Sequence, residues 1–252
     1  MTVLLNGLRT AVYLFVIIAA WWASVRFFNI PHYLLPPPGD VWQRLLSQPS
    51  LFVHHGTITA IEIILALILG SLIGFGTGVV CWISIRLEQV VFPVLVVTQA
   101  LPVFAIAPLL VTWLGYGLAP KLVMATLIVF FPVAISTLNG LKRVPKAWQH
   151  QAIVMRATPG NSFMWIMVPA ALAAIAVGLR LAAVSAPIGA IVGEWVGSAE
   201  GLGFLMLRSN QRVEIDTVFA ALFVLCALTL AIYGLVHWIT SRLLHWAPTT
   251  ER

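Results

Sequence analysis

The sequence predicts an all-α integral membrane protein of one domain, with about six membrane-spanning helices. Of its 252 residues, 61% are hydrophobic and only 9% are charged, and the mean hydropathy is +1.00. An average soluble domain is roughly 45–50% apolar and about 25% charged. A soluble enzyme of this size could not cover its surface with 14 basic and 8 acidic side chains. A disordered chain is excluded as well, because it requires low hydrophobicity.

Six apolar runs are long enough to cross a bilayer as helices. They cover residues 11–28, 57–85, 91–113, 122–138, 166–192 and 218–244. The first resembles a signal peptide in part, but its length and the Trp21-Trp22 pair favour a retained helix. The proline-rich segment 36–39 then breaks the chain, and Asp40 is expected to cap a short surface helix over residues 41–47. Residues 1–252 are therefore read as a single transmembrane domain.

Small residues and prolines predict how these runs pack and where they bend. In the second run, three glycines spaced four residues apart share one helix face, where another helix can approach closely: Gly70, Gly74 and Gly78. The third run is expected to kink or break at its prolines, Pro102 among them. The fifth run holds nine alanines between Ala170 and Ala190, and Ser185 with Pro187 is expected to break it.

The distribution of basic residues predicts the orientation. If both termini are cytoplasmic, eight of the 14 Lys and Arg residues lie inside: Arg9, Arg86, Lys142, Arg143, Lys146, Arg156, Arg242 and Arg252. Five lie outside: Arg26, Arg44, Lys121, Arg208 and Arg212. The last, Arg180, falls within a span. The bias favours cytoplasmic termini and places the long polar segment 139–165 inside the cell.

The segment 139–165 is predicted to form two short helices. Residues 147–156 are compatible with a helix, and Thr158 followed by Pro159 has the residue types of an N-cap and a first helical position. These helices would present apolar and basic side chains to the cytoplasm. The residues alone leave two interpretations open, a solvated loop or a docking surface for a soluble partner.

Polar side chains within or at the ends of the spans are the candidate pathway residues, because burying a charge in lipid is costly. Glu62 is either an interfacial carboxylate or a functional one. Arg180 either contacts a facing helix or backbone carbonyls, or binds solute. Glu194 either lines the pathway, faces an external partner or caps a turn. Gln99, beside the break at Pro102, offers an amide where freed carbonyls can also meet a polar solute.

Other readings of the side chains are weaker. Trp113 either stacks on a ring or belongs to an interfacial aromatic belt. The scarcity of charge inside the spans favours an uncharged or weakly polar pathway over an ion relay. His54 and His55 have no carboxylate or cysteine at ligand spacing, so no metal site is expected. The basic residues form no continuous stripe, so nucleic acid is not an expected partner.

Several segments resemble the bacterial ABC-importer permeases of the nitrate/sulfonate/taurine type, and the resemblance covers residues 33–246. The matching segments are 99–117, Phe130-Phe131-Pro132-Val133, Gly193-Glu194-Trp195-Val196-Gly197, Gly201-Leu202-Gly203 and Gly178-Leu179-Arg180. The family also carries Glu-Ala-Ala-x-x-x-Gly ahead of a Leu-Pro pair, and Val168-Pro169 stands at that pair. Counting back aligns His150, Gln151, Ala152 and Arg156 with the motif, and only Ala152 retains the family residue.

The resemblance implies a type I importer permease in the bacterial inner membrane. Its partners would be a second copy of this chain, two ATPase subunits and a periplasmic binding protein, all in or beside membrane lipid. The contacts that couple the permease to the ATPase would come from His150, Gln151, Ala152, Arg156, Thr158, Pro159, Gly160 and Pro169. The translocation pathway candidates are Gln99, Pro102, Trp113, Arg180, Ser185 and Glu194.

The chain has no G-x-x-x-x-G-K-[ST] phosphate-binding loop. It is therefore expected to be neither an enzyme nor a cofactor protein itself, and ATP and Mg would bind the partner ATPase. The segments 113–117 and 193–197 most resemble permeases for thiamine pyrimidine precursors, which implies a small organic solute. The alternatives are a self-sufficient secondary transporter or channel, or an intramembrane enzyme. Only the importer hypothesis requires the loop over residues 142–169.

Overall fold

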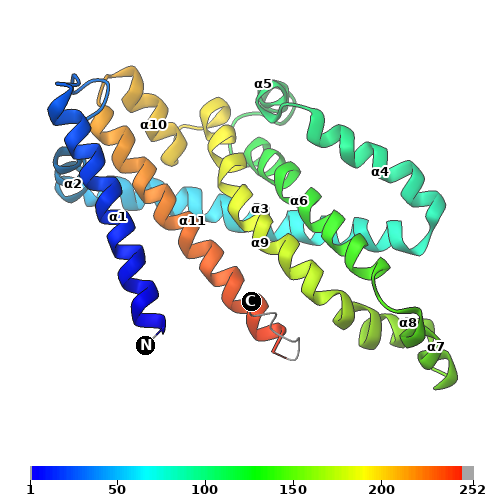
Figure 1. The fold of residues 1–252 in the computed structure, drawn as a ribbon. Helices are drawn as coiled ribbons and strands as arrows, with labels where there is room; N and C mark the ends of the chain where they lie inside the picture. Colours follow the sequence, from blue (N-terminus) through cyan, green and yellow to red (C-terminus); the bar gives the residue numbers. More distant parts are fainter. Residues whose placement is uncertain (1, 246–252) are drawn as a thin grey trace.

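The computed structural model describes residues 2–245, with side chains described for residues 12–13 and 15–245. The described chain is helical, with no strand (Figure 1). Its elements are α1 Thr2–Phe27, α2 Pro38–Ser47, α3 Pro49–Ile83, α4 Ile85–Ala100, α5 Val103–Leu114, α6 Leu118–Lys142, α7 Lys146–Val154, α8 Pro159–Ser162, the π-helical turn η1 Phe163–Met167, α9 Val168–Gly197, α10 Leu202–Gln211 and α11 Ile215–Leu243. The predicted all-α membrane fold is confirmed.

Four helical runs are each long and apolar enough to cross a membrane: Pro49–Ile83, Leu118–Lys142, Pro159–Gly197 and Ile215–Leu243. The predicted third span is a pair of helices, α4 and α5, bent by 97°. Pro102 lies at this break, where the missing N–H of proline releases the chain from the helix. The helix α1 contributes a shorter apolar segment, Phe15–Phe27. The six apolar runs therefore correspond to four uninterrupted helical runs, one bent pair and α1.

The helices α3, α6 and α9 form the centre of the molecule, with α6 packed against both of the others. The backbones approach closely because small residues line both contacts. A Cβ at Gly74 of α3 would lie 2.5 Å from the carbonyl oxygen of Phe130 on α6. A Cβ at Gly178 of α9 would lie 2.6 Å from the Cβ of Ser136 on the other face of α6. Such contacts replace the hydrophobic driving force that lipid does not supply.

The helices α1 and α2 attach at the side of this centre. Trp21 of α1 stacks on Phe219 and Phe223 of α11, with ring centroids 5.7 and 5.9 Å away. Arg44 of α2 donates to Thr217 of α11, from Nε to Oγ1 at 2.8 Å. The guanidinium also approaches the carboxylate of Glu214 at 3.2 Å. The short helix α2 is thereby held to the first turn of α11.

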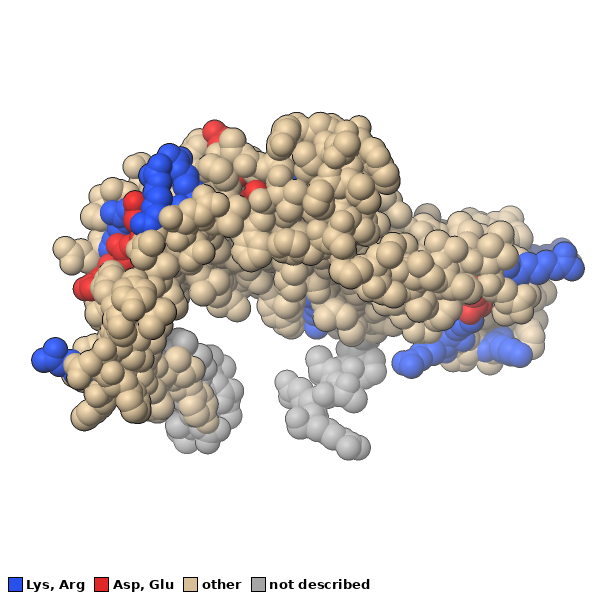
Figure 2. Space-filling model, turned by 90° about the horizontal axis from the view of Figure 1, so that it is seen from above, with Lys and Arg blue, Asp and Glu red and all other residues tan. Residues whose placement is uncertain are grey.

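Charged side chains gather at two opposite ends of the molecule, with a mainly apolar band between them (Figure 2). One end carries the Arg44 and Glu214 pair, and the other carries an ion pair between Lys142 of α6 and Glu88 of α4. This separation is what a protein that spans lipid requires, since charge at the bilayer centre is costly. The loop between α7 and α8 lies at the second end, far from α2 and α10 (Figure 1).

Some predicted boundaries and local features are wrong. Asp40 does not cap a helix, because α2 begins at Pro38 with Pro37 at the N-cap position. Ser185 and Pro187 do not break the fifth span, since α9 runs without interruption from Val168 to Gly197. Lys121, counted among the outer loop charges, is buried in the first turns of α6.

The segment after the predicted fifth span is more helical than the sequence analysis predicts. It contains a ten-residue helix, α10, and the preceding helix α9 reaches Gly197, five residues beyond the predicted end at 192. Five of the first six residues of α10 are apolar, and three of them, Leu202, Leu205 and Met206, pack into a core cluster shared with α2, α3 and α11.

Candidate functional site

The loop between α6 and α9 forms two short helices at one end of the molecule, as the sequence predicts. The first, α7, starts after Pro145, and Ala152 on its inner face is only 1% exposed. The second, α8, starts at Pro159. Its N-cap residue is Thr158, whose hydroxyl oxygen accepts from the N–H of Asn161 at 3.3 Å. The N-cap geometry at Thr158 and Pro159 is confirmed.

Arg156 in the turn between α7 and α8 adopts a left-handed backbone, with φ of 54°. Residues other than glycine are strained in the left-handed region of the backbone, at a cost of roughly 1–2 kcal/mol. Arg156 is also the residue that aligns with the glycine of the family motif. The backbone of the turn thus has the conformation that glycine favours, although the residue at this position is arginine.

A π-helical turn, η1, joins α8 directly to α9, so that Pro159–Gly197 is one helical run of 39 residues. The N–H of Val168 donates to the carbonyl of Phe163, five residues back. The cause lies in Pro169, which has no N–H and whose ring would clash with the carbonyl of Trp165 in a regular α-helix. The wider turn relieves that clash. The α7–α8 loop is therefore mechanically continuous with a membrane-spanning helix.

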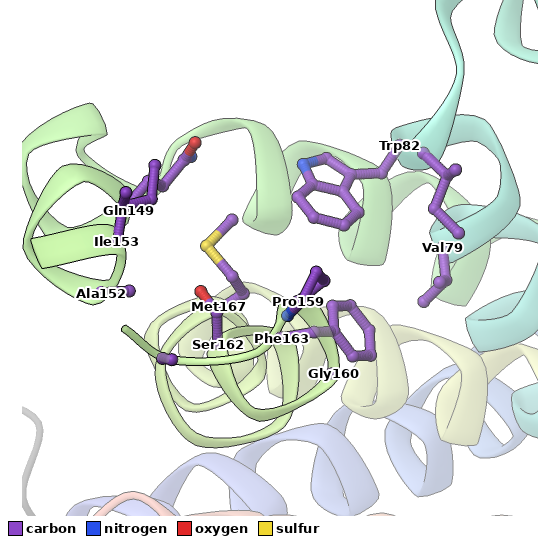
Figure 3. Close-up of a pocket in the computed structure, with 12 residues that line it drawn as sticks. Val79, Trp82, Gln149, Ala152, Ile153, Pro159, Gly160, Ser162, Phe163 and Met167 are labelled. Carbon is purple, nitrogen blue, oxygen red and sulfur yellow. The ribbon is translucent and has the colours of Figure 1, made fainter. Parts of the chain in front are cut away.

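An apolar groove of about 520 Å³ opens between the end of α3 and this loop (Figure 3). The ring of Trp82 on α3 lies tilted against that of Phe163, with centroids 5.7 Å apart. Gln149 and Ile153 of α7 lie across the groove from Trp82, and Met167 projects between the two sides (Figure 3). The groove separates α7 from α3, so α7 projects from the helical body.

The predicted coupling residues occupy different surroundings in this loop. His150 and Gln151 are exposed on α7, whereas Ala152 is buried on the face of α7 that packs against the rest of the chain. The most exposed apolar residues of α7 and the turn that follows it are instead Ile153, Val154 and Met155, with Val154 82% exposed. Sequence reasoning missed these three residues. Their position directly after Ala152, which aligns with the family motif, could have identified them.

The other predicted coupling residues lie at the starts of α8 and α9. Thr158, Pro159 and Gly160 are exposed at the start of α8, and Pro169 is half-buried at the start of α9. A Cβ at Gly160 would meet no atom within 4 Å, so this glycine is not required by packing within the chain. The open surface at Gly160 leaves room for contact from outside.

A second group of residues, the outer polar cluster, lies at the opposite end of the central helices. Its members are His55, Thr59, Glu62, Lys121, Glu194 and Ser198. The ammonium of Lys121 on α6 forms an ion pair with Glu62 on α3 and donates to the hydroxyl of Ser198 at 3.0 Å. Both charged side chains are buried, which rules out the interfacial, solvent-facing interpretation of Glu62. A buried charge of this kind requires its partner.

Glu194 of α9 is fully buried in the outer polar cluster, with 0% exposure. Its Oε1 accepts from the hydroxyl of Thr59 at 2.6 Å, and its Oε2 accepts from the N–H of Gly203. The hydroxyl of Thr59 in turn accepts from the N–H of Leu202 at 2.8 Å. Of the three alternatives for Glu194, the geometry supports the capping of a turn, here the start of α10.

The remaining pathway candidates do not converge on one point. The amide of Gln99 donates to the carbonyl of Leu127 on α6 at 3.2 Å, and Ser185 donates to the carbonyl of Leu181 within α9. Trp113 is exposed at the end of α5. Arg180 of α9 donates to the hydroxyls of Thr240 at 2.9 Å and Ser241 at 3.2 Å on α11. Its contacts are to a facing helix, one of the two alternatives for this residue.

Sequence reasoning also missed Lys121, Thr59 and His55. The pairing of Lys121 with Glu62 could have been predicted, because the span assignment places both residues near the same outer surface. The contacts of Thr59 and His55 could not, because each residue contacts the start of α10, about 145 residues further along the chain.

Comparison with known proteins decides the family. The sequence model of the family described as "Binding-protein-dependent transport system inner membrane component" matches residues 66–245. The chain belongs to this family. It is 43% identical to a "Probable ABC transporter permease protein" of Haemophilus influenzae, over 90% of this chain and 93% of the relative. It is 33% identical to the "Formylaminopyrimidine transport permease protein ThiX" of Halalkalibacterium halodurans, over 96% of both chains.

A solved structure shares the fold of this permease. The chain matches a chain of the MetNI methionine ABC transporter, whose structure shows inward-facing conformations, with a TM-score of 0.70 and 19% sequence identity. The match covers 78% of this chain and 98% of that one. The protein is a transmembrane permease subunit of an ABC importer, which confirms the architecture and function that the sequence segments implied.

Proposed function

We propose that two copies of this chain form the translocation pathway for a small, uncharged heterocyclic solute, and that two ATPase subunits dock on their α7–α8 loops. A periplasmic binding protein delivers the solute at the opposite end, which carries α2 and α10. ATP and Mg bind in the ATPase subunits. Both termini are cytoplasmic, on the side of the α7–α8 loop.

The observation that carries the proposal is the continuous helical run from α8 through η1 to the end of α9. A rigid-body movement applied at the loop reaches the centre of the membrane, because packed helices shift as units and do not deform continuously. The exposed apolar residues Ile153, Val154 and Met155 supply the contact surface. A loop that was only solvated would gain nothing from exposing them.

The arrangement of the helix ends supports the orientation. The N-terminus of α1 and the end of α11 lie toward the same side of the molecule as the α7–α8 loop, and α2, α5 and α10 lie toward the other (Figure 1). Lys142, Arg143, Lys146 and Arg156 in or beside the loop satisfy the tendency of basic residues to stay in the cytoplasm.

The solute class rests on the ThiX relative and on one groove of this chain. A groove of about 690 Å³ between α5, α9 and α11 has no charged residue among those that line it. The rings of Phe104 and Trp195 meet edge to face at its wall, 5.7 Å apart. An anionic sulfonate would lose its hydration there without a cationic partner, whereas a pyrimidine ring gains contact with the aromatic pair.

The docking role is tested by placing a carboxylate on the exposed face of α7. Val154→Asp is expected to weaken the complex with the ATPase subunits by about tenfold or more, because the charge would be buried unpaired in an apolar contact. Asn210→Asp, which adds the same charge on the exposed end of α10, is the control and leaves the affinity unchanged. The measurement is co-purification and ATP-driven uptake of labelled pyrimidine into proteoliposomes.

Two results would contradict the proposal. If Val154→Asp assembles and transports like the parent chain, the ATPase does not dock on this face of α7. If taurine competes with the labelled pyrimidine as well as unlabelled pyrimidine does, the solute class is wrong.

A further inference from the structure

The segment that joins α9 to α11, residues 198–214, is attached to the transport helices by side chains buried within the outer polar cluster. Three consecutive N–H groups, at residues 201–203, point to acceptors on other helices. His55 Nδ1 accepts from Gly201 at 3.0 Å, Thr59 accepts from Leu202 at 2.8 Å, and Glu194 accepts from Gly203. The first N–H groups of a helix have no partner within it, so α10 depends on these acceptors.

Glu194 is the central acceptor of this attachment. Its carboxyl group lies against the first N–H groups of α10, where the helix dipole favours negative charge. It accepts from both Thr59 and Gly203, so one side chain connects α3, α9 and α10. A carboxylate that accepts such bonds away from water makes stronger contacts than a neutral group. Gly201 is required beside it, because φ is 111° and a Cβ there would collide with the carboxylate.

The position of Glu194 along the chain connects this attachment to the α7–α8 loop. It lies on the same helical run that begins at Pro159 and passes through the π-turn, 35 residues earlier in the sequence. Beside it, Lys121 joins α6 to Glu62 of α3 and reaches Ser198 at the start of the 198–214 segment. Movement of that segment is therefore transferred to the centre of the molecule through Glu194 and Lys121.

We propose that Glu194 is a positioning residue that fixes the external segment 198–214 to α9, so that contact with the solute-loaded binding protein is transmitted to the ATPase end. The proposal rests on the proposed function for the identity of that external partner. Glu194 itself touches neither solute nor ATP in this role. Its contribution is the rigidity of the joint between α10 and the transport helices.

The test uses Glu194→Gln in the full complex of permease, ATPase and binding protein in nanodiscs. The glutamine has the same size, but its NH₂ group cannot accept from Thr59 or Gly203, so one bond is lost and a buried donor is left unpaired. Basal ATP hydrolysis is expected to stay near the parent value, while stimulation by loaded binding protein falls by about tenfold, the effect of one such unpaired donor. Glu200→Gln, in the same segment but exposed and outside the bonds of Glu194, is the control for assembly and basal ATP hydrolysis, both of which stay at the parent value.

A second measurement reports on the joint itself and does not depend on transport. Spin labels on exposed residues of α3 and α10, at Val53 and Asn210, give a narrow distance distribution in the parent chain with Cys226 replaced by serine. Glu194→Gln is expected to broaden it, and Glu200→Gln is not.

Unchanged stimulation or an unchanged distribution in Glu194→Gln would overturn the proposal. If Glu194→Gln fails to assemble, Thr59→Val decides, because it removes the bridging hydroxyl and keeps the carboxylate. A parent complex that shows no stimulation, but whose labels still respond to Glu194→Gln, would contradict the proposed function and leave the joint established.

Discussion

Gly74 on α3 offers the sharpest test of how the central helices are packed. A Cβ at this position would lie 2.5 Å from the carbonyl oxygen of Phe130, 2.9 Å from the Cβ of Val133 and 3.1 Å from the backbone nitrogen of Ala134. Non-bonded heavy atoms prefer about 3.5–4.0 Å. Gly74→Ala therefore requires α3 and α6 to separate by about 1 Å, because two of the three obstructing atoms belong to backbone.

The magnitude follows from two opposing effects. Overpacking of a close contact costs about 1–3 kcal/mol, and the higher helix propensity of alanine offsets about 1 kcal/mol of that. The helix α6 cannot move aside freely, because α9 packs against its other face through Gly178 and Gly189. Because α6 cannot give way, the clash falls in the upper half of that range, about 2–3 kcal/mol, and we expect a net destabilisation of about 1–2 kcal/mol for Gly74→Ala.

Gly76, two residues further along the same helix, is the matched control. A Cβ there would meet no atom within 4 Å, so Gly76→Ala gains helix propensity without a clash. Reversible unfolding in mixed micelles, followed by tryptophan fluorescence, measures both variants against the parent chain. A Gly74→Ala chain as stable as the Gly76→Ala chain would refute the close approach of α3 and α6.

Two further predictions concern the buried ion pair and the strained turn. Lys121→Met alone is expected to cost about 3–5 kcal/mol by leaving Glu62 buried without its partner, and the double variant with Glu62→Leu to recover most of that; additive costs in the same unfolding assay would contradict the pairing. Arg156→Gly is expected to stabilise the loop by up to about 1 kcal/mol because it removes the left-handed strain, whereas Arg156→Val destabilises it by about 1 kcal/mol or more, because φ is 54° there. Equal protection of the α7–α8 loop in hydrogen exchange for the two Arg156 variants would argue against the left-handed backbone.

Much of the architecture is predictable because lipid restricts the choices of the backbone. A chain without water to satisfy its N–H and C=O groups must form helices, so apolar runs translate directly into α3, α6, α9 and α11. Two local features could also be predicted from single residues: the bend at Pro102, where the N–H is missing, and the start of α8 at Thr158, whose hydroxyl can cap a helix.

The features that sequence reasoning missed depend on contacts between distant parts of the chain. Lys121 looks like a helix-end charge until α3 brings Glu62 against it from 59 positions away. Pro187 suggests a break, but α9 stays straight enough to place Gly189 against the backbone of Ala125 on α6. In both cases packing against a neighbouring helix decides the outcome, and local propensity does not contain that information.

The same packing locates the places where this permease can move. Between Gly70 and Gly78 on α3, and between Gly178 and Gly189 on α9, the backbones lie too close to α6 to slide past it. A densely packed core of this kind moves as one body. The 97° break at Pro102 and the π-turn ahead of Pro169 depart from regular α-helical hydrogen bonding, so we expect any bending of these helices to begin there. The π-turn lies between the α7–α8 loop and α9, so its stiffness determines how much of a movement at the loop reaches the membrane.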